Sequence, residues 1–259
     1  MEKWLVAAKK ADFQEWSRKF NIDPVLARII RNRDVTEEEE VYKFLYGTLK
    51  DCHSPWLLHG MEDATALLLE EIYNQSHIRV IGDYDVDGIC SSYILTYGLQ
   101  LLGAKVDTAI PHRMKDGYGL NEHLIQEAYD AGATCIVTCD NGISAKDQVR
   151  MAKDLGMRVI ITDHHEVPFE EKEDGRHEIL PPADAIVNPK LENCNYPFKN
   201  ICGAVVAYKV ISALGEKIGY PEFDKILLEL LPFVAMATIC DVMELKDENR
   251  ILVKEGLRQ

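Results

Sequence analysis

The alternation of short apolar runs with helical segments constrains the fold of this chain more than any other feature. Four runs rich in β-branched residues are separated by three amphipathic windows. The runs lie at 78–81, 105–110, 134–138 and 158–162, and the windows at 91–102, 121–131 and 144–155. Continuous apolar strands that alternate with helices are typical of a parallel sheet covered by helices on both faces. The sequence therefore predicts an α/β fold with a mostly parallel sheet.

Helices are also expected on both sides of this alternating region. Residues 1–76 contain no glycine before Gly47 and form a predicted helical N-terminal extension, in which Glu37–Glu40 favour a helix start. The charged segment 166–182 is expected to be an exposed loop. A further strand is expected at 185–187, and helices at 203–214 and 221–240. We divide the chain into the extension 1–76, a catalytic domain 77–241 and a connecting segment 242–259.

The first run is followed by three closely spaced carboxylates, Asp83, Asp85 and Asp87. In an extended chain such residues point to one side, about 6–7 Å apart per step. Three anions placed in this way raise one another's pKa unless a cation lies among them. A surface turn or a helix cap at Asp87-Gly88 is the alternative. A calcium loop of the EF-hand type does not fit, because Ile94 stands where its last glutamate belongs.

Other predicted strand ends carry further candidates. Asp140 follows the third run and by itself suits an ordinary turn, whereas His164 and His165 follow Asp163 directly after the fourth run. Ligands in open α/β sheets bind outside the carboxyl ends of the strands. We therefore interpret the two histidines as ligands or catalytic groups, with Asp163 or Glu166 fixing an imidazole tautomer.

Two residues outside the strand ends complete the candidate set. Asp241 ends the apolar stretch 230–240, where it suits either a further ligand or a solvent-exposed helix end. Arg113 is a candidate phosphate anchor, because a guanidinium fork matches phosphate oxygens.

The charge balance restricts how this chain could bind a polyanion such as nucleic acid. It has 43 acidic against 29 basic residues and a net charge of -14, which argues against binding nucleic acid or anionic membranes by charge alone. The charge balance does not exclude an enzyme that binds phosphates through metal ions. The longest apolar stretch falls short of the about 20 residues that span a bilayer. Seven cysteines without CxxC spacing favour a reducing, cytoplasmic location.

Four motifs occur in a fixed order: GDYDVDGICSS at 82–92, DGYGL at 116–120, TCDNGIS at 138–144 and ITDHHEVP at 161–168. Together they resemble the motifs of the DHH phosphoesterase superfamily. The segments PHRMKDGYGL, IVNPKL, ICGAVVAYKV and TICDVMELKDENR resemble in particular its bacterial single-strand-specific 5′→3′ exonucleases. The resemblance covers roughly residues 40–257.

The resemblance implies a site with two divalent metal ions, Mn²⁺ first and Mg²⁺ as the alternative. Their ligands would be Asp83, Asp85, Asp87, Asp140, His164 and Asp241, with Asp140 bridging. His165 would face the scissile phosphate and Asp163 would orient a histidine. Members of this group continue into a domain that closes over the site. We therefore expect 242–259, which stops in what resembles the middle of a helix, to begin the connection to a missing domain.

The expected function is 5′→3′ exonuclease action on single-stranded DNA in repair and recombination, by a monomer. A water shared by two metals would lose a proton near neutral pH and attack the phosphorus in line. A mixed Asp/His site suits Mn²⁺ better than Mg²⁺. One alternative is a related hydrolase of oligoribonucleotides, cyclic dinucleotides or pyrophosphate. Another is a non-catalytic replication scaffold that has kept the fold.

Overall fold

The computed structural model describes residues 3, 9–173 and 175–259. The helices are α1 Phe13–Phe20, α2 Pro24–Asn32, α3 Glu38–Tyr46, α4 Met61–Tyr73, α5 Val86–Leu101, α6 Glu122–Asp130, α7 Lys146–Asp154, α8 Gly203–Ile218, α9 Phe223–Cys240 and α10 Asp247–Gly256, with short 3₁₀ turns η1 Leu49–Asp51 and η2 Pro55–Leu57. The strands are β1 His77–Ile81, β2 Lys105–Ala109, β3 Cys135–Cys139, β4 Arg158–Thr162, β5 Phe169–Lys172, β6 Gly175–Glu178 and β7 Ala185–Val187.

Five strands form one parallel sheet in the order β2-β1-β3-β4-β7, which confirms the predicted fold class. The chain places β2 on one side of β1 and then returns to place β3 on the other side. This reversal opens a crevice outside the carboxyl ends of β1 and β3, the usual binding position in open α/β sheets. The topology therefore directs the segments after β1 and β3 toward each other.

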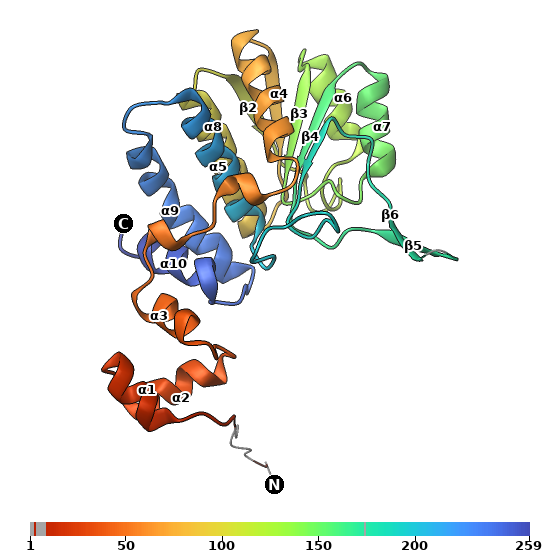
Figure 1. Ribbon diagram of the computed structural model, residues 1–259. Coiled ribbons are helices and arrows are strands. Elements are labelled where there is room, and N and C mark those ends of the chain that lie inside the picture. The colour runs from red at the N-terminus through yellow and green to blue at the C-terminus, as the bar shows by residue number, and fades with distance from the viewer. Residues whose placement is uncertain (1–2, 4–8, 174) are drawn as a thin grey trace.

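Alternate residues of the buried strands face two different helix layers. In β3, Cys135 and Val137 belong to the apolar cluster that includes α4, α5, α8 and α9, whereas Ile136 belongs to the cluster with α6 and α7. Figure 1 shows these layers on the two faces of the sheet. Both faces of these strands are therefore buried from solvent, which explains their continuous apolar runs.

Helix α8 is the central helix of the larger layer. Twelve of its 16 residues are buried, and it packs against α4, α5 and α9. A helix that is apolar around most of its circumference belongs in a protein interior. Because α4 contributes Met61, Ala64 and Leu68 to the same cluster, it is packed into the main body. The division of the chain at residue 76 nevertheless stays a prediction.

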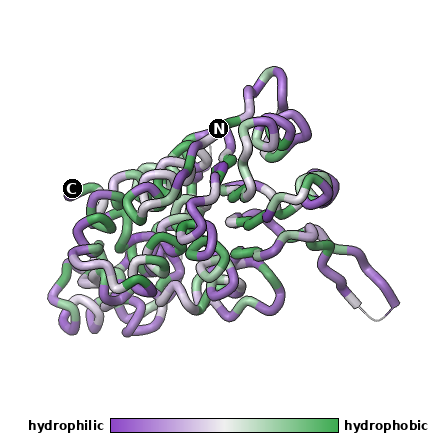
Figure 2. Tube along the Cα trace, turned by 90° about the horizontal axis from the view of Figure 1, so that it is seen from above, coloured by the Kyte–Doolittle hydropathy of each residue, from purple (hydrophilic) through white to green (hydrophobic). Residues whose placement is uncertain are grey.

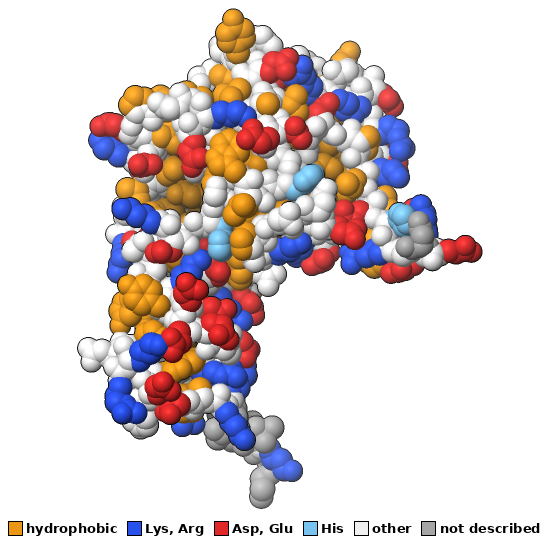
Figure 3. Space-filling model, in the orientation of Figure 1, with side chains coloured by type: hydrophobic (Ala, Val, Ile, Leu, Met, Phe, Trp, Pro, Cys, Tyr) orange, Lys and Arg blue, Asp and Glu red, His pale blue; other side chains and the backbone are white. Residues whose placement is uncertain are grey.

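The N-terminal helices α1, α2 and α3 form an arm that extends away from the main body (Figure 1). The arm has its own small apolar cluster around Phe20, Ile30, Val41 and Phe44. Figure 3 shows acidic and basic side chains interspersed with apolar ones on the arm, and Val25, Ile29 and Tyr42 of α2 and α3 are exposed. The arm contacts the body through α10, where Arg250 Nε donates to the Phe44 carbonyl oxygen at 2.7 Å.

The structure differs from the sequence expectations in two places. Segment 166–182 is exposed but contains an antiparallel hairpin of β5 and β6, which projects from the body as a hydrophilic ribbon (Figure 2). Its side chains face solvent, so no apolar alternation marks the strands. Helix α5 begins at Val86, before the expected residue 91. Helix α10 ends at Gly256 and packs against α9 and α3, and the interpretation of 242–259 as a connecting segment stays a prediction.

The part of the chain that the structure describes contains no helix long and apolar enough to cross a membrane.

Candidate metal centre

The sheet and two helix ends bring the candidate residues together. Asp83 follows β1, Asp140 follows β3 and His164 follows β4, whereas Asp87 lies in the first turn of α5 and Asp241 caps the end of α9. Ligand atoms of Asp87, His164 and Asp241 all lie within 4.8 Å of one another. The same is true of Asp140, His164 and His165. His164 therefore belongs to both groups.

Asp140 is the residue that most clearly fits a bound cation. Its side chain is buried, and neither carboxylate oxygen makes a hydrogen bond of regular geometry among the described residues, although Oδ1 lies 3.0 Å from His164 Nε2. Burial and the nearby Asp87 raise the pKa of Asp140 to about 11. A buried carboxylate without a partner is costly unless it is neutralised by a proton or by a positive ion. The acidic surroundings of Asp140 thus suit a metal ion.

His164 lies at short distances from three carboxylates. Its Nε2 atom is 3.0 Å from Asp140 Oδ1, 3.6 Å from Asp87 Oδ2 and 3.8 Å from Asp241 Oδ2. Burial lowers the pKa of His164, against the opposing effect of Asp87. A neutral imidazole keeps a nitrogen lone pair for a metal ion. Burial raises the pKa of Asp241 as well.

The amino end of α8 holds Asp87 in place. The backbone N–H groups of Gly203 and Ala204 donate to its two carboxylate oxygens at 2.7 and 2.8 Å. Free N–H groups and the helix dipole make a helix amino end a favourable position for an anion. Gly203 also allows close approach, because a Cβ atom there would lie 2.7 Å from Asp140 Cβ.

The prediction that Asp83, Asp85 and Asp87 lie in one extended segment is wrong, because the chain enters helix α5 after Asp85. Asp85 is the amino-terminal cap of α5 and accepts from the Gly88 N–H at 2.9 Å, so the chain turns into a helix at this point. The cap that we considered at Asp87 lies two residues earlier. Asp85, Asp87 and Asp241 nevertheless line one cavity of about 130 Å³.

Asp83 lies two residues after the end of β1. It is buried, its Oδ1 atom accepts from the Gly119 N–H at 3.3 Å, and its Oδ2 atom has no partner in the described part of the chain. Burial raises the pKa of Asp83. It is therefore a second carboxylate with an unpaired buried oxygen, although it lies outside the two groups around His164.

His165 is held between Asp163 and Tyr118. Its Nδ1 atom is 2.7 Å from Asp163 Oδ1, and this hydrogen bond raises the pKa of His165. Burial alone would raise the pKa of Asp163, but the bond from His165 and backbone N–H groups hold it below the usual value. Asp163, rather than the exposed Glu166, is therefore the carboxylate that contacts His165.

Tyr118 approaches the other nitrogen of His165. Its hydroxyl donates to the Asp140 carbonyl oxygen at 3.1 Å and is also 3.1 Å from His165 Nε2. A hydroxyl has one hydrogen and a carbonyl only accepts, so His165 Nε2–H is then the donor toward Tyr118. Asp163 and Tyr118 thus each favour a proton on the ring nitrogen that they face.

Arg113 lies outside the cluster of carboxylates and histidines. It is exposed, and its guanidinium lies 5.3 Å from the centre of the Tyr84 ring. Tyr84 packs edge-on against Tyr118 at 6.2 Å, so two aromatic rings separate Arg113 from His165. Its role as a phosphate anchor stays a prediction.

Two asparagines support the site and were not recognised in the sequence. Asn141 Nδ2 donates to the carbonyl oxygens of Ile81 and Cys139, which ties together the ends of β1 and β3. Asn188 Nδ2 donates to the His165 carbonyl oxygen at 3.0 Å. Both lie within motifs of the sequence, but only their position in the fold reveals these contacts. The same is true of Gly203.

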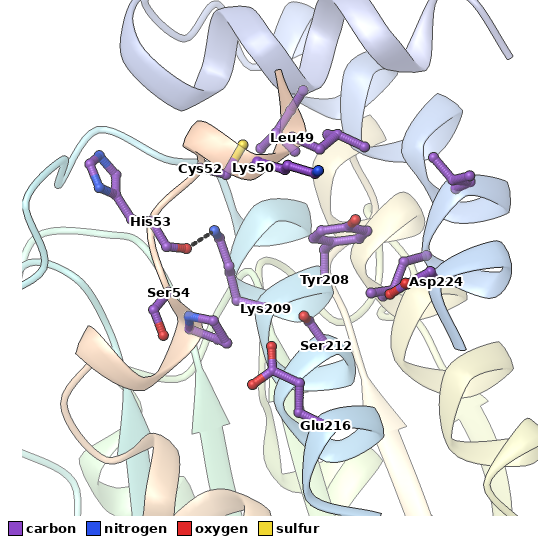
Figure 4. A pocket seen from close by; sticks show the side chains of 14 residues that line it. Leu49, Lys50, Cys52, His53, Ser54, Tyr208, Lys209, Ser212, Glu216 and Asp224 are labelled. Carbon is purple, nitrogen blue, oxygen red and sulfur yellow. Dashed lines mark hydrogen bonds between the residues drawn. The ribbon is translucent and has the colours of Figure 1, made fainter. Parts of the chain in front are cut away.

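A cavity of about 480 Å³ lies away from this centre, between η1, η2 and helices α8 and α9. Figure 4 shows Lys209 donating to the His53 carbonyl oxygen on one side of it, at 2.5 Å. The same ammonium is 2.8 Å from the buried Glu248 carboxylate. This lysine is thus already paired.

Comparison with known proteins places the motifs in a family. The profile described as "DHH family, N-terminal domain" matches residues 77–238. The single-stranded-DNA-specific exonuclease RecJ of Bacillus subtilis is 37% identical over 243 residues, which cover 94% of this chain and 29% of the relative. RecJ of Haemophilus influenzae is 38% identical over 240 residues, covering 90% of this chain and 40% of the relative.

Solved structures give the same result. RecJ from Thermus thermophilus in complex with Mn²⁺ matches with a TM-score of 0.73 and 31% identity, over 95% of this chain and 33% of that one. An exonuclease RecJ bound to manganese matches with a TM-score of 0.67 and 38% identity, over 78% of this chain and 48% of that one. The chain thus spans less than half the length of these relatives. By its motifs, its sheet and the profile over residues 77–238, the chain belongs to the DHH family.

Proposed function

We propose that this chain is the catalytic part of a metal-dependent phosphodiesterase, a 5′→3′ exonuclease that degrades single-stranded DNA in repair and recombination. The observation that carries the proposal is the buried Asp140 carboxylate, which makes no hydrogen bond of regular geometry among the described residues and lies beside His164, Asp87 and Asp241. The similar RecJ proteins, named as single-stranded-DNA-specific exonucleases, include structures with Mn²⁺ or Mg²⁺.

The proposed metal ligands are the five aspartates and one histidine around the crevice. They are Asp83, Asp85, Asp87, Asp140, His164 and Asp241. Two divalent ions bound there would polarise phosphate oxygens and supply a nucleophilic water. The imidazole in the set favours Mn²⁺ over Mg²⁺.

The protein's own groups would position the phosphate and balance its charge. In the proposed mechanism, Asp163 holds His165 with a proton on each nitrogen, so that its Nε2–H faces the scissile phosphate once Tyr118 yields this hydrogen bond. Donors directed at developing negative charge stabilise a transition state. Gly203 and Ala204 keep Asp87 in place during the reaction.

The remaining assignments are parts of the same proposal. Tyr118 and Tyr84 offer aromatic surface for unpaired bases, and Arg113 offers a cation beside them. Residues 1–76, 77–241 and 242–259 would be an extension, the catalytic domain and a connecting segment. Action as a cytoplasmic monomer stays a prediction.

The test is hydrolysis of a 5′-labelled single-stranded oligonucleotide with Mn²⁺, with Mg²⁺ and with EDTA. We expect labelled mononucleotides with Mn²⁺ and none with EDTA. The matched control is Asp140→Asn, which keeps the side-chain shape but removes the charge. Activity confined to dinucleotides, cyclic dinucleotides or pyrophosphate would indicate another hydrolase. Failure to bind about two Mn²⁺ per chain would indicate a scaffold.

A further inference from the structure

A second cavity adjoins His165 on the side that faces α7. Its volume is about 330 Å³, and its lining includes Tyr118, Leu120, Ile143, Ser144, Gln148 and His165. Pockets for small ligands begin at about 300 Å³. The cavity is therefore large enough for one flat heterocycle beside the candidate catalytic histidine.

The two cavities near the histidines differ in charge. The smaller one is lined by Asp85, Asp87 and Asp241 and suits cations and the phosphate that they attract. In the larger one, the charged lining residues Asp163 and His165 are paired with each other at 2.7 Å. The larger cavity therefore presents no unpaired charge to a ligand from the residues that the structure describes. Adjacent ionic and neutral sites match a molecule that carries a phosphate next to an uncharged ring.

The walls of the neutral cavity combine apolar surface with free hydrogen-bonding groups. Leu120 and Ile143 are buried apolar residues, and the Tyr118 side chain is 51% exposed. The Ser144 hydroxyl and the Gln148 carboxamide have no hydrogen-bond partner within the described ranges. A carboxamide can pair in two places with the edge of adenine. These groups suit the edge and the face of a nucleobase.

We propose that this cavity is a nucleobase subsite, which takes the base of the nucleotide whose phosphate lies at His165. The inference rests on the proposed function and adds to it a base preference. Ser144 and Gln148 contact the edge of the base, and the Tyr118 ring lies against its face. Stacking on an aromatic side chain contributes about 1–3 kcal/mol per base. Gln148 would favour adenine over thymine at this one position.

The experiment is cleavage of otherwise identical single strands in which one abasic residue is moved stepwise from the 5′ end. We expect kcat/KM to fall about 5- to 150-fold at one position and little elsewhere. At that position, the wild-type protein should cleave adenine-containing strands faster than thymine-containing ones. Gln148→Leu should bring this ratio close to one. Gln126→Leu is the control, because Gln126 is exposed on α6 and bonded to Asp130.

The outcomes separate this inference from the proposed function. Efficient cleavage with equal rates at every abasic position, or an adenine ratio unchanged by Gln148→Leu, would overturn the subsite and leave the exonuclease assignment intact. No cleavage of any oligonucleotide would overturn both. Thermal unfolding of the variants shows whether they are folded. Ser144→Ala, on the surface, is a second variant that we expect to weaken the effect of the abasic residue at this position without loss of stability.

Discussion

Asp140 adopts the left-handed backbone region, with a φ of 59°, and its side chain lies near the carboxylates of Asp87 and Asp85. Backbone strain of this kind persists only where the surrounding structure enforces it. Here the bonds that Asn141 makes to the ends of β1 and β3 fix the turn. The turn therefore directs a carboxylate that is unfavourable in isolation toward the position of the proposed metals.

The raised pKa of Asp140 makes the stability of the metal-free protein depend on pH. Burial and the nearby Asp87 hold the pKa of Asp140 in the folded state well above that in the unfolded chain, so the folded state keeps its proton over an interval that begins near pH 4. Folding therefore becomes less favourable as the pH rises through this interval. Asparagine needs no such proton, so Asp140→Asn should raise the free energy of unfolding at pH 8 by more than about 1 kcal/mol. Urea unfolding in EDTA at pH 5 and pH 8 measures the difference, which should shrink at pH 5.

Addition of Mn²⁺ provides the control for this prediction. The wild-type protein should gain stability with Mn²⁺ because the ion binds only the folded state, whereas Asp140→Asn should gain little. An equal gain in both proteins would show that Asp140 is not a ligand.

His165 and Asp140 should differ in what their removal abolishes. His165→Ala should lower kcat about 10²- to 10³-fold, because a donor toward the phosphate is lost. Metal binding should persist, since Asp163 orients His165 and leaves His164 in contact with the carboxylates. Calorimetric titration with Mn²⁺, next to single-turnover cleavage, separates the two effects. Loss of metal in His165→Ala to the same extent as in Asp140→Asn would contradict the assignment.

At the scale of elements, the amino end of α8 is part of the site. Gly203→Ala would place a Cβ atom 2.7 Å from Asp140 Cβ, so either Asp140 or the helix must move. We expect Mn²⁺ affinity to fall about 10- to 100-fold, as for changes in groups that orient ligands. Ser212→Ala, further along α8, is the matched control and should leave the affinity unchanged. An unaltered Mn²⁺ affinity in Gly203→Ala would show that the amino end of α8 does not position the metal ligands.

The buried pair of Lys209 and Glu248 connects α8 with α10. The Glu248 side chain is fully buried, and it also accepts from the Tyr196 hydroxyl at 2.5 Å. Glu248→Gln leaves the Lys209 ammonium without a counter-charge and should cost about 3–5 kcal/mol of unfolding free energy. Combining it with Lys209→Met should recover part of this loss. Chemical unfolding measures both.

A control on the same helix distinguishes a buried pair from an exposed one. Glu255 pairs with the exposed Arg258, and Glu255→Gln should change stability by less than about 1 kcal/mol. A similarly small effect of Glu248→Gln would show that the buried pair contributes little.

At the scale of the whole molecule, the net charge of -14 opposes contact with DNA unless metals intervene. We therefore expect little binding of a non-cleavable single strand in EDTA, and measurable binding with Mn²⁺. Because few Lys or Arg side chains contact phosphates, the logarithm of the DNA association constant should fall with the logarithm of the salt concentration with a slope of about -2 or shallower. Fluorescence anisotropy measures both, with Asp140→Asn as the control. Tight binding in EDTA with a steep slope would instead indicate a basic DNA-binding surface.

Elements that are buried in the fold were predicted from the sequence, whereas exposed elements and those at the site were missed in part. Strands β3 and β4 lie where the apolar runs predicted them, because burial on both faces requires continuous apolar residues. The first residues of α5 were missed because Asp87 and Gly88 interrupt the apolar periodicity there, although Asp85 caps the helix. The hairpin of β5 and β6 was missed because exposed strands need no apolar alternation.

The sequence by itself determined the parallel sheet, the family and the types of side chain at the ends of the strands, since strand burial and local motifs involve residues near one another in the chain. Only the tertiary structure decided which carboxylates share His164, that α8 holds Asp87, and that Tyr118 contacts His165. These contacts join distant segments, such as Asp87 with Gly203, and their geometry depends on how α8 packs against α5 and the sheet. Packing of this kind has no local pattern in the sequence.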